Sequence, residues 1–130
     1  MAHGEIKYIE IPADDPARAK RYYEAVLGWQ IDPAPRPDYW TCRSSSGFGG
    51  AIGRRGVTAG QTIRDFLEVD TIDSALEASE ANGGVTKQPK AEIAGLGWLA
   101  LVNDSEGNEL GLFQSSSRGG PGVVRAIRDE

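Results

Sequence analysis

The sequence predicts an α+β fold built from two similar modules, and three observations support this prediction. A β-branched, alternating segment near the N-terminus is typical of a strand, and a capped amphipathic helix follows it. The same order of strand and helix starts again near residue 63. Asp15 and Gly28, which bracket the first helix, are 13 positions apart, as are Asp70 and Gly83 around the second, so the modules are offset by 55 residues.

The first module begins with a strand over residues 5–11. A helix follows, with Asp15 as its N-cap, Pro16 at its first position and Gly28 at its end. The strand offers isoleucines to the core, namely Ile6, Ile9 and Ile11, and the helix offers the apolar face Ala19, Tyr22, Tyr23 and Val26. The proline-rich stretch over residues 33–37 is predicted to be a stiff connection or a sheet edge, and two further strands follow over residues 39–43 and 49–54.

The second module repeats this order. A strand over residues 63–69 leads to a helix that begins at Asp70 or Thr71 and ends at residues 82–84. Two more strands, over residues 98–102 and 110–113, are joined by a turn at residues 104–108. We therefore predict one domain over residues 1–115, with modules at about 5–56 and 60–115, and a flexible tail over residues 116–130.

Composition narrows the possible functions. The 130 residues are 39% hydrophobic and 25% charged, as in a soluble globular protein, and the net charge of −5 argues against nucleic-acid binding. No apolar stretch approaches the length of a membrane span and no secretory signal is visible, so we expect a cytoplasmic protein. The one cysteine, Cys42, excludes an internal disulfide, and the one histidine, His3, excludes a histidine-based catalytic triad in the folded body.

Four motifs occur in order along the chain: IEIPADDPARAKRYYEAVLGW at 9–29, GGAIG at 49–53, VDTIDSAL at 69–76 followed by NGG at 82–84, and DSEGNELGLFQ at 104–114. Together they resemble the vicinal oxygen chelate superfamily, the group of glyoxalases, bleomycin-resistance proteins and extradiol dioxygenases. The resemblance implies two βαβββ modules that form a curved mixed sheet around a central cavity. It also implies a homodimer that binds a small molecule.

The resemblance further implies where the metal ligands of this superfamily would lie. Those positions fall on Tyr8, Arg64 and Gly111, with a fourth near Gly50. Tyrosine, arginine and glycine do not supply the imidazole and carboxylate set that holds a divalent ion, and Arg64 brings a fixed positive charge. We therefore expect no cofactor, with a nonstandard divalent metal site as the alternative.

Residues two apart on a strand share a face, so Glu10 accompanies Tyr8, Glu68 accompanies Arg64, and Glu109 accompanies Gly111. We predict a ligand-binding site made of Tyr8, Glu10, Trp40, Arg64, Glu68, Trp98 and Glu109. In one interpretation Arg64 pairs with the carboxylates and the set binds a polar or cationic ligand. In another the carboxylates hold Mg²⁺ or Mn²⁺, or act as a general base. In a third interpretation the carboxylates lie in water at the rim of the sheet, and the two tryptophans pack in the core and do not contact a ligand.

Three hypotheses for the function follow. The leading one is a protein that binds a small organic molecule without the usual metal. The second is a lyase, isomerase or epimerase, with Glu10 and Arg64 as the candidate catalytic residues, in which Arg64 stabilises an enolate-like charge. The third is a noncatalytic assembly or regulatory protein. We expect no nucleic-acid or membrane partner.

Overall fold

A computed structural model describes residues 3–47 and 49–116 of the chain. The chain divides into two compact units. We call residues 8–64 the α1 unit, and residues 3–7 together with 65–116 the α2 unit. Apart from its first residue, the predicted tail over residues 116–130 lies outside the described residues.

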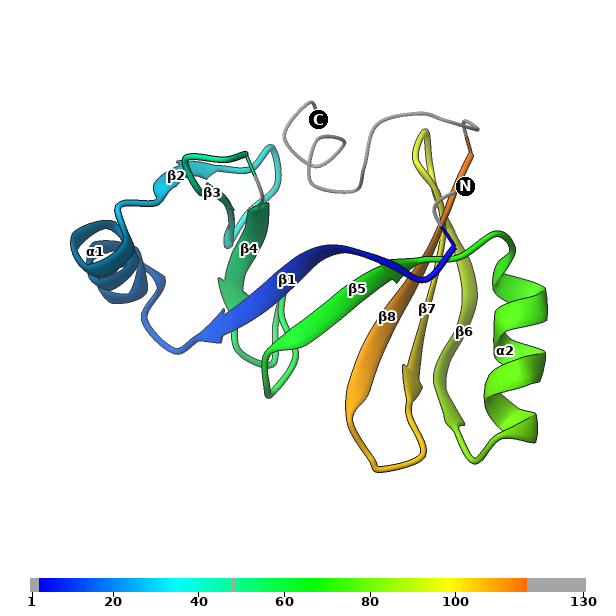
Figure 1. Ribbon diagram of the computed structural model, residues 1–130. Coiled ribbons are helices and arrows are strands. Elements are labelled where there is room, and N and C mark those ends of the chain that lie inside the picture. The colour runs from blue at the N-terminus through cyan, green and yellow to red at the C-terminus, as the bar shows by residue number, and fades with distance from the viewer. Residues whose placement is uncertain (1–2, 48, 117–130) are drawn as a thin grey trace. The chain divides into compact units, whose positions relative to one another are not determined.

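The α1 unit contains one helix and four strands (Figure 1). In chain order these are β1 (Glu5–Ala13), of which residues 8–13 belong to this unit, α1 (Pro16–Leu27), β2 (Gln30–Pro33), β3 (Tyr39–Arg43) and β4 (Gly49–Arg54). The strands lie in the order β2–β3–β4–β1, with β1 parallel to β4 and the other pairs antiparallel.

The α2 unit has the same order of elements. They are β5 (Arg64–Glu68), of which residues 65–68 belong to this unit, α2 (Ile72–Ala81), β6 (Val85–Ile93), β7 (Gly97–Asn103) and β8 (Glu109–Ser115). The strand order is β5–β8–β7–β6, with β5 parallel to β8 and the other pairs antiparallel. Each unit is thus a βαβββ module, and the predicted α+β fold class is confirmed.

Both helices begin and end through local chemistry that the sequence signals. The Asp15 carboxylate accepts a hydrogen bond of 3.2 Å from the backbone N–H of Arg18, and Gly28 takes up a left-handed conformation with φ of 68°. Thr71, rather than Asp70, caps α2, because its hydroxyl accepts from the backbone N–H of Ser74. In the described part of the chain no helix is long and apolar enough to cross a membrane.

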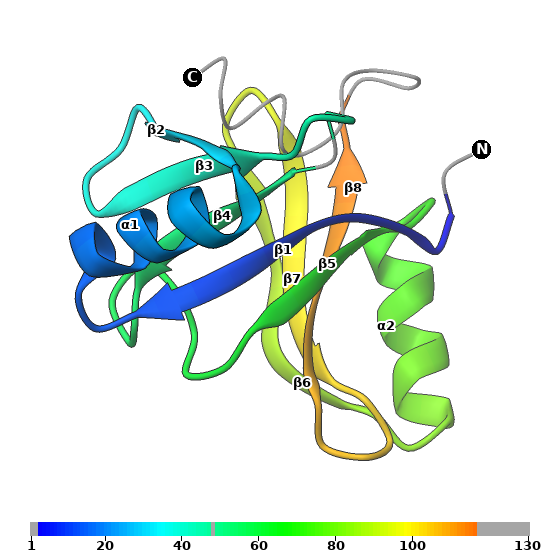
Figure 2. The same ribbon diagram turned by 60° about the vertical axis from the view of Figure 1, so that its left-hand side comes forward.

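The apolar core of the α1 unit lies between α1 and one face of its strands, a packing that Figure 2 shows from the helix side. Its buried members are Ile11, Ala13, Ile31, Cys42 and Ile52, against which Ala19 and Tyr23 of α1 pack. Two predictions of core residues are wrong here. Tyr22 and Val26 are 58% and 57% exposed, because the strands cover a narrower stripe of α1 than its apolar residues occupy. Ile6 is also exposed: it lies near the start of β1, on the strand face opposite to Ile9 and Ile11.

The α2 unit buries Val69, Ile72, Ala100, Val102 and Leu112 beneath α2. Its outermost strand, β6, was not predicted from the sequence. Most of β6 is exposed, it contains Pro89, and its register with β7 shifts twice. An edge strand buries neither face fully, so it lacks the alternation that reveals inner strands, and proline is tolerated there. For the same reason the short β2 lies partly in the segment predicted as a connection.

Candidate functional site

The face of β1 opposite to the helix α1 carries the first two candidate residues, Tyr8 and Glu10. Ile9 and Ile11 point to the helix-covered core, so the alternation of the strand sends Tyr8 and Glu10 to the opposite face. Both side chains are buried, and Glu10 is only 3% exposed. A carboxylate removed from water in this way requires compensating partners.

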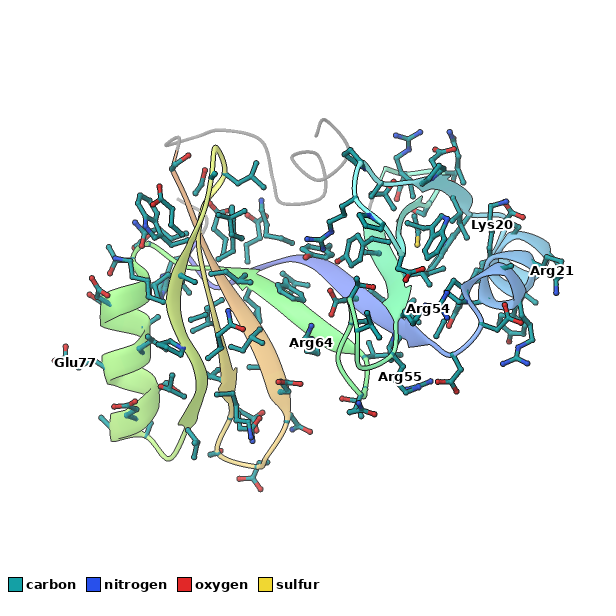
Figure 3. All side chains as sticks on the ribbon, turned by 180° about the vertical axis from the view of Figure 1, so that it is seen from behind. Lys20, Arg21, Arg54, Arg55, Arg64 and Glu77 are labelled. Carbon is teal, nitrogen blue, oxygen red and sulfur yellow. The ribbon has the colours of Figure 1, made fainter. Side chains whose placement is uncertain are left out.

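Glu10 finds those partners within the α1 unit. The Tyr39 hydroxyl, from β3, donates a hydrogen bond of 2.8 Å to its Oε2. The guanidinium of Arg64, at the last position of the unit, donates from Nε to Oε1 over 3.0 Å and from a terminal nitrogen to the same oxygen. Figure 3 shows Arg64 where β5 begins. We call Tyr8, Glu10, Tyr39 and Arg64 the Glu10 cluster.

A close approach of the backbone holds the Arg64 side chain in place. A methyl group added at Gly60 would lie 3.1–3.3 Å from three atoms of the Arg64 side chain, so only glycine leaves the guanidinium its full space. At the end of β4, exposed ion pairs join Arg54 to Asp38 and Arg55 to Asp14. Among the described residues no buried side-chain nitrogen or oxygen lacks a hydrogen-bond partner.

The two phenols of the cluster stay protonated at neutral pH. Burial is the largest cause that raises the pKa of Tyr8, and the negative charge of Glu10 raises it further. Hydrogen bonding with Tyr39 and the charges of Arg36 and Arg64 offset a part of this rise. Burial likewise raises the pKa of Tyr39, with Tyr8 and Glu10 adding to the effect. Both side chains therefore act as neutral hydrogen-bonding groups.

The electrostatic balance of this region differs from the acidic character of the whole chain. The Arg64 guanidinium offsets the charge of the Glu10 carboxylate. Arg36 adds a further positive charge, since its exposed guanidinium lies over the Tyr39 ring with its carbon 3.8 Å from the ring centroid. The cluster and Arg36 together carry one net positive charge.

The other four predicted site residues are described within their own units. Trp40 is on the β3 face opposite to Tyr39, and it packs against the apolar core of the α1 unit. Glu68, in the α2 unit, lies 3.4 Å from the ammonium of Lys7. Trp98 packs against the core of that unit, and Glu109 is half-buried at the start of β8. The structure therefore brings Tyr8, Glu10 and Arg64 together within the α1 unit, where Trp40 lies on the opposite face of its strand, and it assigns Glu68, Trp98 and Glu109 to the α2 unit.

Two residues of this region were missed at the sequence level, namely Tyr39 and Arg36. Tyr39 follows three prolines and begins the strand in which Trp40, the larger aromatic residue, was predicted to bind the ligand. The sequence did contain one signal: strand alternation places Tyr39 and Thr41 on one face, opposite to Trp40 and Cys42. The structure shows that Tyr39 and Thr41 are both buried. Arg36 carries no sequence signal, since an exposed arginine between two prolines is typical of a loop.

The residues at the family's metal positions do not fit a divalent cation. At Gly50 an added Cβ would lie 2.6 Å from the carbonyl oxygen of Ile9, and at Gly111 it would lie 2.3 Å from the Phe66 ring. Neither position has room for a ligating side chain. The other two positions hold the protonated Tyr8 and the cationic Arg64, which repels a metal ion. Among the described residues no cluster of three or more potential ligands occurs.

Two hollows also occur in the α1 unit. A small apolar cavity of about 30 Å³ lies beside Cys42, Ile9 and Trp29. Burial raises the pKa of the Cys42 thiol to about 12, so it is not a nucleophile at neutral pH. A wider groove of about 340 Å³ lies between α1 and the end of β1, where Tyr22 and Arg18 meet the paired Asp14 and Arg55.

The two βαβββ modules agree with the comparisons. A family model described as a glyoxalase-like domain matches residues 8–113, and the chain therefore belongs to the glyoxalase-like domain family. The putative glyoxylase CFP32 of Mycobacterium tuberculosis (strain CDC 1551 / Oshkosh) is 23% identical over 129 residues, with 93% of this chain and 49% of that protein covered. The chain thus spans about half the length of this relative.

A glyoxylase-like domain-containing protein of Didymella fabae is 26% identical over 120 residues, which cover 83% of this chain and 91% of the relative. Among solved structures, a glyoxalase/bleomycin resistance protein/dioxygenase superfamily member from Vibrio splendidus 12B01 matches with a TM-score of 0.63 and 15% identity, over 83% of this chain and 97% of that one. The resemblance to the vicinal oxygen chelate superfamily is confirmed at the level of the fold.

Proposed function

We propose that this protein binds a small organic molecule at the Glu10 cluster and that it does so without a metal ion. One observation carries the proposal: a buried carboxylate, a guanidinium and two neutral phenols meet within one unit. Hydrogen bonds to a ligand in such a weakly hydrated place are stronger than in water. A site of this kind selects a ligand by its polar pattern and does not need a coordination bond.

The charge balance indicates the kind of ligand. Arg64 already neutralises Glu10, and Arg36 adds a positive charge at the edge of the cluster. A cation gains little there, whereas a carbonyl or carboxylate oxygen suits the guanidinium donors. The ligand class that these contacts support is therefore a neutral or anionic hydrogen-bond acceptor, rather than the cationic ligand considered from the overall charge.

A screen for binding tests this proposal. The protein is treated with EDTA, and a library of small oxo-acids, carboxylates and amides is screened by thermal shift and confirmed by calorimetry. We expect hits whose affinity falls about 5- to 10-fold in Tyr39→Phe, because this variant loses the hydrogen bond that orients the Glu10 carboxylate, and one hydrogen bond contributes about 1–1.5 kcal/mol. Tyr22→Phe, which removes the hydroxyl of an exposed tyrosine, is the matched control and should not change affinity. Binding that requires added Mn²⁺ or Ni²⁺, or that Tyr39→Phe leaves intact, would refute the proposal.

Catalysis by Glu10 is the second candidate function, and one specific observation favours it. A carboxylate has about four acceptor positions, and Arg64 uses two on Oε1 while Tyr39 uses one on Oε2. The remaining position on Oε2 suits a general base for a lyase, isomerase or epimerase, beside a guanidinium that stabilises an enolate-like charge. Relatives carry the name glyoxylase, which agrees with an enzyme. If a screening hit is turned over, Glu10→Gln should abolish turnover while Tyr22→Phe leaves it unchanged.

A further inference from the structure

The chain contains three asparagines, and they differ in the residue that follows each of them. Gly83 follows Asn82, whereas acidic residues follow Asn103 and Asn108. The backbone nitrogen of the next residue can attack an asparagine amide, and glycine hinders this attack least because it has no side chain. The pair of Asn82 and Gly83 is therefore a candidate modification site, and it plays no part in the proposed ligand site.

The helix α2 ends at this pair, before the short connection to β6 (Figure 1). Asn82 is the C-cap, and its Nδ2 donates a hydrogen bond of 2.8 Å to the carbonyl of Ala78, which has no partner within the helix. Gly83 has a φ of 95°, which favours glycine, and a Cβ at Gly84 would clash with the Ser79 hydroxyl. The turn into β6 thus needs both glycines, so the reactive pair is part of how the helix ends.

The two reacting groups are accessible at Asn82. Asn82 and Gly83 are both exposed, and within the described residues the Gly83 N–H has no hydrogen-bond partner. After Asn103 the corresponding N–H, that of Asp104, donates over 2.8 Å to a backbone carbonyl. Asn108 is itself held, because its side chain and its backbone nitrogen both donate to the Asp104 carboxylate. At Asn82 a single side-chain hydrogen bond, at a helix end that frays readily, opens before reaction.

We propose that Asn82 deamidates spontaneously in the folded protein through a cyclic imide. The Gly83 nitrogen loses its proton and forms a bond to Cγ of Asn82. The bond from Cγ to Nδ2 breaks, and Nδ2 leaves as ammonia with that proton. Water then opens the ring at either of its two carbonyls, which gives aspartate or isoaspartate at position 82. Water is the co-reactant, and no oxidant or reductant takes part.

The product alters the end of α2. The new carboxylate cannot donate to the Ala78 carbonyl, and it places a negative charge at the negative end of the helix dipole. The helix contains Asp73, Glu77 and Glu80 and no lysine or arginine that would compensate. Isoaspartate also adds a methylene to the backbone shortly before Val85, where the pairing of β6 with β7 begins. The last turn of α2 and the start of β6 should therefore loosen as the protein ages.

Peptide mapping of stored protein tests the proposal. The wild type is incubated at neutral pH, both native and in urea, and is then digested with trypsin in a mildly acidic buffer that limits further deamidation. The tryptic peptide 65–87 contains Asn82, and the peptide 91–118 contains the other two asparagines. In native protein we expect the first peptide to gain the mass of an amide-to-acid exchange at least about 5-fold faster, because attack at Asn103 first requires a hydrogen bond to open.

Two variants and the product type make the result specific. Asn82→Gln should leave peptide 65–87 unmodified, because glutamine has to close a larger ring, whereas Asn108→Gln should not change the rate at Asn82. Electron-transfer fragmentation should find isoaspartate, which direct hydrolysis of the amide does not produce. The native rate should lie within about 10-fold of the rate in urea, since one hydrogen bond must open. An unmodified peptide, a product without isoaspartate, or a native rate more than about 10-fold below the rate in urea would overturn the proposal.

The variant Asn82→Asp measures the effect on the fold. We expect its melting temperature to fall by about 4 °C, because it lacks the donor to Ala78 and adds the unfavourable charge. Gln88→Glu makes the same exchange at an exposed position of β6 and should shift melting less than half as much. Equal melting of the two variants would overturn the expected loosening of α2. None of these residues belongs to the Glu10 cluster, so the outcome does not bear on the proposed ligand site.

Discussion

Removal of the Arg64 charge gives the most direct test of the Glu10 cluster. Arg64→Met keeps a side chain of similar length but leaves the Glu10 carboxylate, whose side chain is 4% exposed, with Tyr39 as its remaining donor in the cluster. Breaking a buried ion pair from one side costs about 3–5 kcal/mol, because the charge left behind is not solvated. That loss is a large fraction of the roughly 5–15 kcal/mol by which a domain of this kind is stable. Urea unfolding followed by tryptophan fluorescence measures it.

A double-mutant cycle separates the ion pair from the packing of the arginine stem. In Glu10→Gln/Arg64→Met no charge remains buried, so most of the stability should return, and the coupling between the two sites should exceed about 1 kcal/mol. Arg54→Met is the control, because Arg54 forms an exposed ion pair with Asp38, and its unfolding midpoint should stay close to that of the wild type. A loss below about 1 kcal/mol in Arg64→Met, or no recovery in the double variant, would refute the reasoning.

Three further predictions follow from other parts of the chain. Trp40→Ala should lower the free energy of unfolding by about 3–5 kcal/mol without changing the intrinsic affinity for a ligand, since Trp40 packs in the core of the α1 unit; a loss of affinity in a variant of unchanged stability would place it in the site. The Cys42 thiol, with its pKa raised to about 12 by burial, should not react with a thiol reagent at neutral pH in the native protein and should react once urea unfolds it; rapid native labelling would contradict this. The backbone N–H groups of Asn108 and Glu106 lower the pKa of Asp104, so this carboxylate stabilises the fold above its unfolded pKa and the contribution is lost as pH falls. Asp104→Asn should therefore flatten the acid side of the stability profile, and equal acid sensitivity of both proteins would contradict the assignment.

Local signals predicted most of the fold. Asp15 and Gly28 set the ends of α1 through a side-chain acceptor and a left-handed backbone, both of which depend on the residue itself and its neighbours. Whether a residue of α1 is buried depends on how wide a stripe of the helix the sheet covers. The helical period of the sequence does not give this width. Tyr22 and Val26 follow the period and remain exposed for that reason.

The candidate site was predictable where strand alternation decides the outcome. Tyr8 and Glu10 lie on one face because they are two residues apart. One interpretation of the sequence paired Arg64 with one or more of three glutamates without choosing among them, and in the structure Arg64 donates to Glu10. The contribution of Tyr39 depends on the register of β3 against β4, in which Tyr39 is opposite Gly53. The register depends on how two separate segments of the chain pair, and it could not be predicted here from the sequence of either segment.

The outer edge of β6 has a consequence for the behaviour of the protein in concentrated solution. An unpaired strand edge is a template onto which a strand of another molecule can add, and this is a common route to aggregation. Between residues 85 and 93 this edge strand contains Lys87, Pro89 and Lys90, and its register with β7 shifts twice. Charged side chains, a proline and an irregular ladder in an edge strand each obstruct the addition of another strand. The segment that looks least like a strand in the sequence thereby keeps the sheet from growing.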